Sequence, residues 1–430
     1  MARTNINSSE TVFAIKMTAY QQMIPIFEAL KIIKRETFVL LSEMIDLENS
    51  VGRVLAQEIR ADMDLPPFDR SQMDGYAVRT KDVGDASENG SVKLKIIGES
   101  VAGKGFDEKV KRVEAVRIMT GARVPDGADS VQKKELARET ENGEGGSFVK
   151  ILVPTKPRQN IVLKGAEIET GAKVFDQGEL INVQMIASLA SFGYAKVKVF
   201  KKPRVTILAT GSEIVNVNQK PRRDQIRNSN SIMLKVFAEK CAAETKVLPI
   251  VKDEIQNLKS KIQNCLSACD VLIISGGVSV GDYDFTKPAL RDIGAEIFFE
   301  RVSLRPGKPT VFAKLDNKLI FGLPGNPVSV AVTFYLFVRA ALLKMQGAKD
   351  CELKKGFAVA AKEIKGAKER DSFLPVFVEM NKKGELVIES LHFGGSSNFI
   401  AFSRANALAF VPKGKAYKPS NVIEIAYLPY

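Results

Sequence analysis

In residues 203–327, short apolar runs alternate with segments whose apolar residues recur at helical spacing. This pattern predicts an α/β region. The apolar runs predict strands at 205–209, 246–251, 271–275 and 319–323. The stretches of helical spacing predict helices at 231–240, 256–267 and, after the last strand, 328–345. Strands that alternate with helices indicate a doubly wound, mostly parallel sheet with helices on both of its faces.

The flanking regions follow other patterns. Apolar positions between Thr11 and Lys34 predict one or two amphipathic helices, and residues 47–53 predict another helix that runs into a strand. Short strand-like runs at 92–97, 115–119 and 148–153 predict a β-rich domain. A second group of such runs predicts a small C-terminal β-barrel, at 356–361, 374–379, 385–389, 407–412 and 422–426. The acidic, glycine-rich stretch 139–146 is expected to be an exposed loop.

Composition limits the chemistry. The chain has 430 residues, so several domains are expected. It contains a single histidine, His392, which argues against histidine-rich zinc sites and Ser-His-Asp relays. Catalysis is therefore expected to use carboxylates, cations and backbone amides. Four cysteines are too few for a disulfide scaffold, and we interpret Cys265 and Cys269 as small buried helix residues.

Localisation and partner class follow from charge and hydropathy. The most apolar stretches, around 330–343 and 271–275, are too short to span a membrane or are interrupted by Arg339, and the N-terminus lacks a signal-peptide pattern. We therefore expect a cytoplasmic protein without a membrane partner. The net charge of +13 comes from scattered basic residues such as Arg222 and Arg223. It favours a solvated surface or a basic cleft for a small anion over nucleic acid.

Candidate chemistry lies where the predicted parallel strands end, because ligands of open α/β sheets bind beyond the carboxyl ends of the strands. The Ser275-Gly276-Gly277 turn suits a phosphate, and Pro324-Gly325-Asn326-Pro327 follows the last strand. Glu213, Asp253 and Asp284 come after neighbouring strands. Three carboxylates at a phosphate site require a cation, and hard oxygen ligands favour Mg²⁺. A simple helix-capping role for Glu213 or Asp253 stays open.

Two further loops have unusual composition. Arg301, Arg305 and Lys308 form a cationic loop that could hold a phosphate or another oxyanion, or be an exposed basic turn. The segment 66–78 mixes aromatic residues with Asp69, Ser71 and Asp74, as expected of a loop that reaches into another site.

These segments together resemble the molybdopterin molybdenumtransferases, the bacterial MoeA family that is similar to the C-terminal domain of gephyrin. The resemblance covers about residues 23–430. The matching motifs are Phe68-Asp69-Arg70-Ser71-Gln72-Met73-Asp74-Gly75-Tyr76-Ala77, Arg117-Ile118-Met119-Thr120-Gly121-Ala122, Thr210-Gly211-Ser212-Glu213, Ser275 to Gly281 with Asp284, Pro306-Gly307-Lys308-Pro309 and Gly322 to Pro327.

The resemblance implies a homodimer of four-domain subunits. The implied domains are N-terminal helices with an elongated linking domain (1–60 and 160–200), an inserted β-rich domain (61–159), an α/β domain similar to molybdopterin adenylyltransferases (201–347) and the C-terminal barrel (348–430). It also implies the reaction, in which adenylylated molybdopterin and molybdate, with Mg²⁺, give molybdenum cofactor and AMP. Molybdopterin adenylyltransferase and proteins that deliver the cofactor to molybdoenzymes are implied as further partners.

The resemblance also implies residue roles. Glu213, Asp253 and Asp284 match the acidic residues of the nucleotide and Mg²⁺ site, and Asp74 and Thr120 match residues that complete the cleft of the partner subunit. The implied substrate-binding residues are Glu167, Ser275, Gly276, Gly277, Ser279, Arg301, Arg305, Lys308, Pro324, Gly325, Asn326, Arg370 and Ser397. Among these residues, Asp74, Glu213, Asp253 and Asp284 are the expected catalytic group.

The chain departs from the family pattern at a few positions. Arg301 and Arg305 stand where many relatives have Lys, and Asn228 replaces a common Asp. Two alternative functions are a nucleotide-handling enzyme similar to the adenylyltransferase and a scaffold protein similar to gephyrin. The additional domains and the Asp74 loop argue against the first alternative, and an intact acidic and basic cleft argues against the second.

Overall fold

The protein is described from a computed structural model that covers residues 23–142, 146–252, 254–278, 285–391 and 397–429. The chain forms two compact units. The large unit comprises residues 1–57, 177–186 and 196–430, and the small unit comprises residues 58–176 and 187–195. Each unit is described on its own below.

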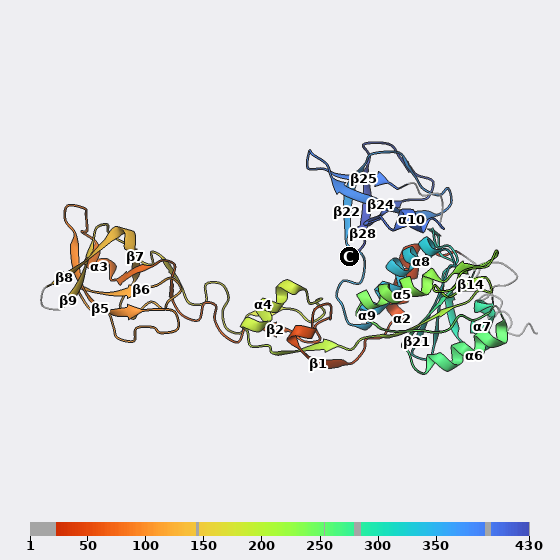
Figure 1. The fold of residues 1–430 in the computed structure, drawn as a ribbon, viewed down its shortest axis with the longest axis horizontal. Coiled ribbons are helices and arrows are strands. Elements are labelled where there is room, and N and C mark those ends of the chain that lie inside the picture. Colours follow the sequence, from red (N-terminus) through yellow and green to blue (C-terminus); the bar gives the residue numbers. More distant parts are fainter. Residues whose placement is uncertain (1–22, 143–145, 253, 279–284, 392–396, 430) are drawn as a thin grey trace, which may run out of the picture. The chain divides into compact units, whose positions relative to one another are not determined.

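A six-stranded sheet forms the centre of the large unit (Figure 1). Its strand order is β16 (Glu244–Val247), β13 (Arg204–Ala209), β17 (Val271–Ser275), β21 (Lys318–Leu323), β20 (Val311–Leu315) and β18 (Glu296–Phe299). The first four strands are parallel, which confirms the mostly parallel sheet. Strand β20 is antiparallel to both of its neighbours, β21 and β18. It returns directly into β21 through a tight hairpin at Asp316, which has φ of +51°.

Helices cover both faces of this sheet, as the sequence predicted (Figure 1). One face packs against α2 (Ile26–Glu36), α5 (Ser229–Lys240), α8 (Pro327–Thr333) and α9 (Arg339–Met345), and the other against α6 (Ile255–Leu266) and α7 (Thr286–Asp292). Successive strand residues point to opposite faces. In β13, Val205 and Ile207 therefore join the first core and Leu208 joins the second. Cys265 and Cys269 are buried in the second core, as predicted, but only Cys265 is a helix residue, because α6 ends at Leu266.

The helix after β21 agrees with the predicted range 328–345 to within one residue. It runs from Pro327 to Met345 through a π-helical turn at Phe334–Val338, and Arg339 does not interrupt it. Arg339 is accommodated because its guanidinium donates a hydrogen bond to the Cys351 carbonyl at 3.1 Å. By length and composition this helix could cross a membrane, but 83% of its most apolar window is buried inside the protein. It is a core helix of the α/β domain.

The C-terminal part of the large unit is a closed barrel of five strands. The strands are β22 (Lys355–Ala360), β24 (Asp371–Met380), β25 (Leu386–Ser390), β26 (Ala407–Val411) and β28 (Val422–Tyr427). Pairing between β24 and β26 closes the barrel. The short strand β19 (Leu304–Arg305) of the α/β domain adds to its edge, with Leu304 opposite Asp371.

The expected helix at 47–53 is wrong. Only Leu47–Asn49 is helical, as one 3₁₀ turn after β1 (Ser42–Asp46), which pairs with β12 (Lys196–Phe200). The chain leaves the helical path because Arg53 turns inward and is 5% exposed. Its guanidinium donates hydrogen bonds to Glu43 at 2.6 Å and to the Phe200 carbonyl at 2.7 Å.

A second six-stranded sheet forms the core of the small unit. Its order is β7 (Ser130–Lys133), β4 (Gly75–Val78), β6 (Glu114–Ile118), β5 (Val92–Ser100), β9 (Gly146–Ile151) and β8 (Ala137–Asn142). The exposed loop expected at 139–146 is therefore wrong for residues 139–142 and 146, which lie in β8 and β9. Three hydrogen bonds hold the Glu139 carboxylate in place. Arg117 donates two of them, at 2.7 and 2.6 Å, and the Tyr76 hydroxyl donates the third.

This network predicts a pH-dependent contribution to stability. The hydrogen bonds from Arg117 lower the pKa of Glu139 to about 2, whereas an unfolded glutamate titrates near 4.5. The network therefore stabilises the fold above pH 4.5, and this contribution is lost as the pH falls toward 2. We expect Glu139→Gln to lower the free energy of unfolding at pH 7 by about 1 kcal/mol or less, because the pair is half exposed.

Denaturant unfolding at pH 7 and pH 3 measures this effect. The difference between wild type and Glu139→Gln is expected to shrink at the lower pH. Glu141→Gln, on the same strand, is the control, because Glu141 has no such partner among the described residues. Equal differences at both pH values for Glu139→Gln would contradict the assignment.

Candidate functional site

Three parallel strands end side by side at one edge of the central sheet. Ala209, Ser275 and Leu323 are in register at the ends of β13, β17 and β21. From β13 the chain first adds β16 on one side and then β17 on the other, so the strand order reverses between β13 and β17. This reversal is where open α/β sheets bind ligands. The predicted convergence of strand ends is thus present.

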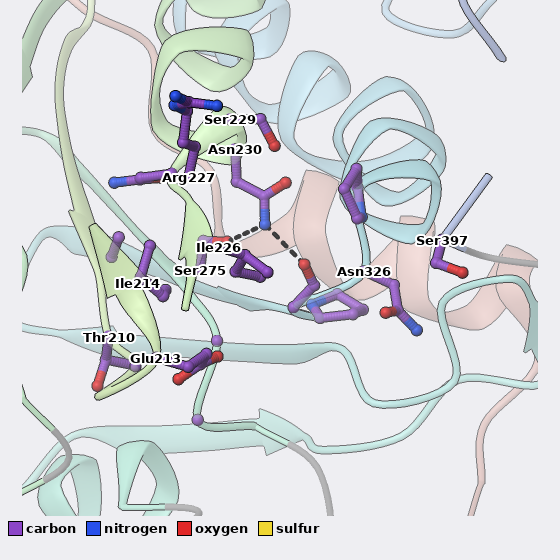
Figure 2. Close-up of a pocket in the computed structure, with 18 of the residues that line it drawn as sticks. Thr210, Glu213, Ile214, Ile226, Arg227, Ser229, Asn230, Ser275, Asn326 and Ser397 are labelled. Atoms are coloured by element: carbon purple, nitrogen blue, oxygen red, sulfur yellow. Dashed lines mark hydrogen bonds between the residues drawn. The ribbon is translucent and has the colours of Figure 1, made fainter. Parts of the chain in front are cut away.

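A pocket of about 1300 Å³ opens at this edge (Figure 2). Its walls come from the segments that follow β13, β17 and β21, from the N-terminal end of α5, and from the turn at Ser397 and Phe399. Of the predicted site residues, it is lined by Glu213, Ser275, Gly276, Gly277, Pro324, Gly325, Asn326 and Ser397. These residues lie far apart in the sequence, and the fold brings them to one cavity.

The turn after β17 requires glycine. Gly276 has φ of +96°, and a Cβ there would lie 2.4 Å from the carbonyl oxygen of Thr210. Gly277 has φ of +61°. The turn is fixed on both sides, because Thr210 N–H donates to the Ser275 carbonyl at 3.1 Å and Gly276 N–H donates to the Leu323 carbonyl at 3.1 Å. The backbone therefore passes close to the pocket in a conformation that a side chain would disturb.

Two asparagines organise the N-terminal end of α5 at the pocket. Asn228 caps the helix, since its Oδ1 accepts from Ser231 N–H at 3.1 Å. Asn228 is therefore the N-cap of α5. Asn230 donates from Nδ2 to the Ser275 hydroxyl at 3.1 Å and to the Gly325 carbonyl at 2.7 Å (Figure 2). Its Oδ1 is buried and has no hydrogen-bond partner among the described residues.

The acidic group is only partly within the described structure. Glu213 lines the pocket and is exposed there, whereas Asp253, Asp284 and Ser279 lie outside the described residues. Among the residues that are described, no three of His, Cys, Asp or Glu gather closely enough to hold a metal ion. The part of the donor set that is described, a carboxylate beside hydroxyl and carbonyl oxygens, is of the kind that Mg²⁺ prefers.

The cationic loop is a neighbour of the pocket. Arg301, Arg305 and Lys308 are not among its lining residues, but the adjoining Pro309 is. Strand β19, which contains Arg305, pairs with β24 of the barrel, and Arg370 donates to the Leu304 carbonyl at 3.2 Å. Arg370 thus attaches the loop to the barrel.

The remaining predicted residues lie in the small unit. The Asp74 carboxylate accepts hydrogen bonds from the Thr120 N–H and hydroxyl, both at 2.8 Å. These hydrogen bonds lower the pKa of Asp74, so this exposed carboxyl group is held in its charged form. Glu167 forms an ion pair in the small unit, with its Oε1 3.0 Å from Nη2 of Arg70. The structure therefore brings Asp74 and Thr120 together.

Several residues of the pocket wall were not predicted from the sequence, among them two polar residues near the start of α5. Asn230 and Arg227 line the cavity, and neither was a predicted site residue. The signal was the Asn228-Ser229-Asn230 segment before an expected helix, which is typical of a capped helix N-terminus. It could indicate the cap but not the distant hydrogen bonds of Asn230.

We expect Asn230→Ala to lower kcat/KM of the proposed reaction by about tenfold, because it removes two hydrogen bonds that join the β17 and β21 loops. Steady-state kinetics measures the change. Asn264→Ala, on the exposed surface of α6, is the control. Equal kinetics of the two variants would refute a role for Asn230 in shaping the pocket.

Comparisons with known families cover most of the chain. Residues 24–193 match the profile "MoeA N-terminal region (domain I and II)". Residues 206–344 match "Probable molybdopterin binding domain", and residues 358–428 match "MoeA C-terminal region (domain IV)". The pocket lies mainly in the second of these regions.

Whole-length relatives agree with these matches. A molybdopterin molybdenumtransferase of Staphylococcus aureus (strain COL) is 36% identical over 403 residues, which cover 94% of this chain and 95% of that protein. A protein of the same name from Staphylococcus epidermidis (strain ATCC 12228) is 34% identical over the same length. The crystal structure of the molybdopterin biosynthesis MoeA protein from Pyrococcus horikoshii OT3 has a TM-score of 0.80 at 30% identity, covering 95% of this chain and all of that one.

Proposed function

This chain belongs to the MoeA family and is an enzyme of the molybdopterin molybdenumtransferase type, active in molybdenum cofactor biosynthesis, and on that premise we propose the details of its reaction. It transfers molybdenum from molybdate to adenylylated molybdopterin. The phosphoanhydride that joins AMP to the pterin is hydrolysed, and AMP is released. The observation that carries this proposal is the pocket at the aligned ends of β13, β17 and β21.

Several pocket features suit the anionic phosphoanhydride. The glycine turn at Gly276 and Gly277 lets the substrate approach the backbone closely. The N-terminal end of α5, a twelve-residue helix, contributes N–H groups and the positive end of its dipole. Asn230 Oδ1 is a buried acceptor with no partner in the described part of the chain, and an N–H group of the bound substrate would satisfy it. Together these groups orient the substrate for cleavage.

Glu213, with Asp253 and Asp284, is proposed to hold Mg²⁺, which when bound would neutralise charge on the phosphates. Arg301, Arg305 and Lys308 are proposed to bind molybdate or the substrate, because guanidinium groups match oxyanions well. Ser397 lines the pocket from the barrel side and adds a hydroxyl group. These roles rest on the family resemblance and on where the described residues lie.

The protein is further proposed to act as a cytoplasmic homodimer. Phe27, Leu41 and Val183 of the large unit are 70%, 76% and 69% exposed in the single chain, as expected of residues that a second subunit covers. The four cysteines are buried free thiols, which suits a reducing compartment. Molybdopterin adenylyltransferase and cofactor-delivery proteins are its proposed partners.

The dimer has a specific consequence for activity. If Asp74 and Thr120 of one subunit complete the cleft of the other, Asp74→Ala and Glu213→Gln inactivate different halves of one site. We expect mixed dimers of these two inactive variants to regain activity, because one of their two clefts is intact. Sedimentation at micromolar concentration checks the dimer itself, and a monomer or a failure of complementation would contradict this arrangement.

Product analysis tests the proposed reaction against its alternative. Incubation with adenylylated molybdopterin, molybdate and Mg²⁺ is expected to release AMP and to leave molybdenum on the pterin. Formation of adenylylated molybdopterin from ATP and molybdopterin would instead indicate an adenylyltransferase-like activity. The match to a transferase over 94% of the chain favours the first outcome.

A further inference from the structure

A basic turn at the edge of the pocket has no role in the reaction described so far. It comprises the connection after β14 (Ile214–Val215) together with the parallel strand β15 (Ile226–Arg227), residues 216–227, and we name it the basic rim. It contains four cations and one carboxylate, so its net charge is 4 − 1 = +3. The cations are Lys220, Arg222, Arg223 and Arg227, and all four are exposed.

The hydrogen bonds that hold the basic rim in its conformation leave most of its cationic side-chain groups unused. Arg222 N–H donates to the Gln225 side chain at 3.1 Å, and Asn216 N–H donates to the Gln219 side chain at 3.2 Å. Arg227 donates from Nε to the Gln219 carbonyl at 3.1 Å. None of the four cations forms an ion pair with a residue that the structure describes. Glutamine side chains and backbone groups shape the turn, and the cationic groups are left for a ligand.

This turn also belongs to the pocket wall. Ile226 and Arg227 line the cavity (Figure 2), as do Pro221 and Gln225. Lys220 and Arg222 flank Pro221 in the chain. Glu213, the pocket's one lining carboxylate among the described residues, repels an incoming anion. A cationic rim offsets this repulsion at the entrance, and a charged entrance raises the association rate of an anion. Such an effect weakens with salt, because the Debye length falls to about 3 Å at 1 M.

We propose that the basic rim captures the anionic phosphoanhydride substrate and guides it into the pocket. The inference rests on the proposed function, because it concerns the substrate of that same site. A small anion fits better than an acidic protein, since the cations lie within the turn that lines the cavity. The rim is therefore a determinant of substrate affinity and association rate and takes no part in bond cleavage.

The test compares two double variants with the same loss of charge. Arg222→Gln/Arg223→Gln removes two charges from the rim, and Lys382→Gln/Lys383→Gln removes two from the exposed hairpin between β24 and β25. At low salt, we expect the rim variant to lower kcat/KM by about tenfold with kcat unchanged, and the difference from wild type to vanish at high salt. The hairpin variant is expected to match wild type at every salt concentration.

A second probe separates this inference from the proposed reaction. ADP shares the adenosine and the phosphoanhydride of the substrate, and stopped-flow mixing gives its association rate. A slower association with the rim variant alone supports the inference. Equal rates for wild type and the rim variant, or equal losses in both variants, would overturn it while leaving the proposed reaction standing. Absence of turnover and of ADP binding in wild type would refute the proposed reaction and this inference with it.

An acidic protein partner is the remaining outcome. If the rim variant loses binding to purified molybdopterin adenylyltransferase but keeps wild-type kinetics and ADP association, the turn is a protein-docking surface. That result would also overturn substrate capture.

Discussion

Asp284→Ala and Asp253→Ala are each expected to lower kcat by about a thousandfold or more while leaving the fold intact. Both residues lie outside the described part of the structure, so the expectation rests on their places in the sequence and on the family motif. Asp253 comes two residues after Val251, which is hydrogen-bonded to the end of β13, and Asp284 follows the glycine turn after β17. A carboxylate that holds the catalytic cation contributes several kcal/mol to the transition state.

A matched control lies beside the first of these residues. Glu254→Gln removes an adjacent carboxylate that instead accepts a hydrogen bond from Asn257 on α6, so its kcat should stay near that of wild type. Mg²⁺ titration adds a second readout, since loss of a ligand raises the concentration of Mg²⁺ needed for half-maximal rate. Full activity of Asp253→Ala or Asp284→Ala would count against the metal assignment.

Gly276→Ala is expected to remove most of the activity and to destabilise the large unit. The left-handed backbone at Gly276 alone costs a non-glycine residue about 1–3 kcal/mol. The new Cβ would in addition lie 2.4 Å from the Thr210 carbonyl oxygen, so β13 and β17 must separate at their ends. That separation displaces the loops that form the pocket, and both turnover and unfolding temperature should fall.

Gly325→Ala provides the comparison within the same pocket. A Cβ at Gly325 meets no atom within 4 Å, and the carbonyl that accepts from Asn230 is retained. Its unfolding temperature should therefore stay near that of wild type. If Gly276→Ala unfolds at the same temperature as Gly325→Ala and keeps wild-type turnover, the close approach at Gly276 has no functional meaning.

Much of the central sheet could be predicted from sequence because its strands are buried on both faces. The predicted strand 271–275 coincides with β17, and its first four residues are all apolar. The predicted strands 205–209 and 319–323 each miss one residue of β13 and β21. Fully buried parallel strands give continuous apolar runs that turns or helices bound clearly. Since ligands bind at the ends of such strands, the glycine turn and the 324–327 segment could also be predicted.

Other features depend on contacts that no local pattern contains. Glu139 lies in a strand because Arg117 and Tyr76, from distant segments, hydrogen-bond to it. Strands β18 and β20 were not predicted, because an alternation of strands and helices indicates parallel strands and does not indicate antiparallel pairing at the edge of the sheet. Asn230 became a pocket residue only when folding placed its side chain beside Ser275 and Gly325.

The central claim is that the edge formed by β13, β17 and β21 binds the substrate's phosphoanhydride with its cation. A crystal structure of the protein soaked with Mg²⁺ and adenylylated molybdopterin, or with ADP, tests it most directly. We expect phosphate density between the Thr210–Gly211 segment and the Ser275–Gly277 turn, with Mg²⁺ bound to Glu213. Nucleotide bound elsewhere, with this pocket unchanged, would contradict it.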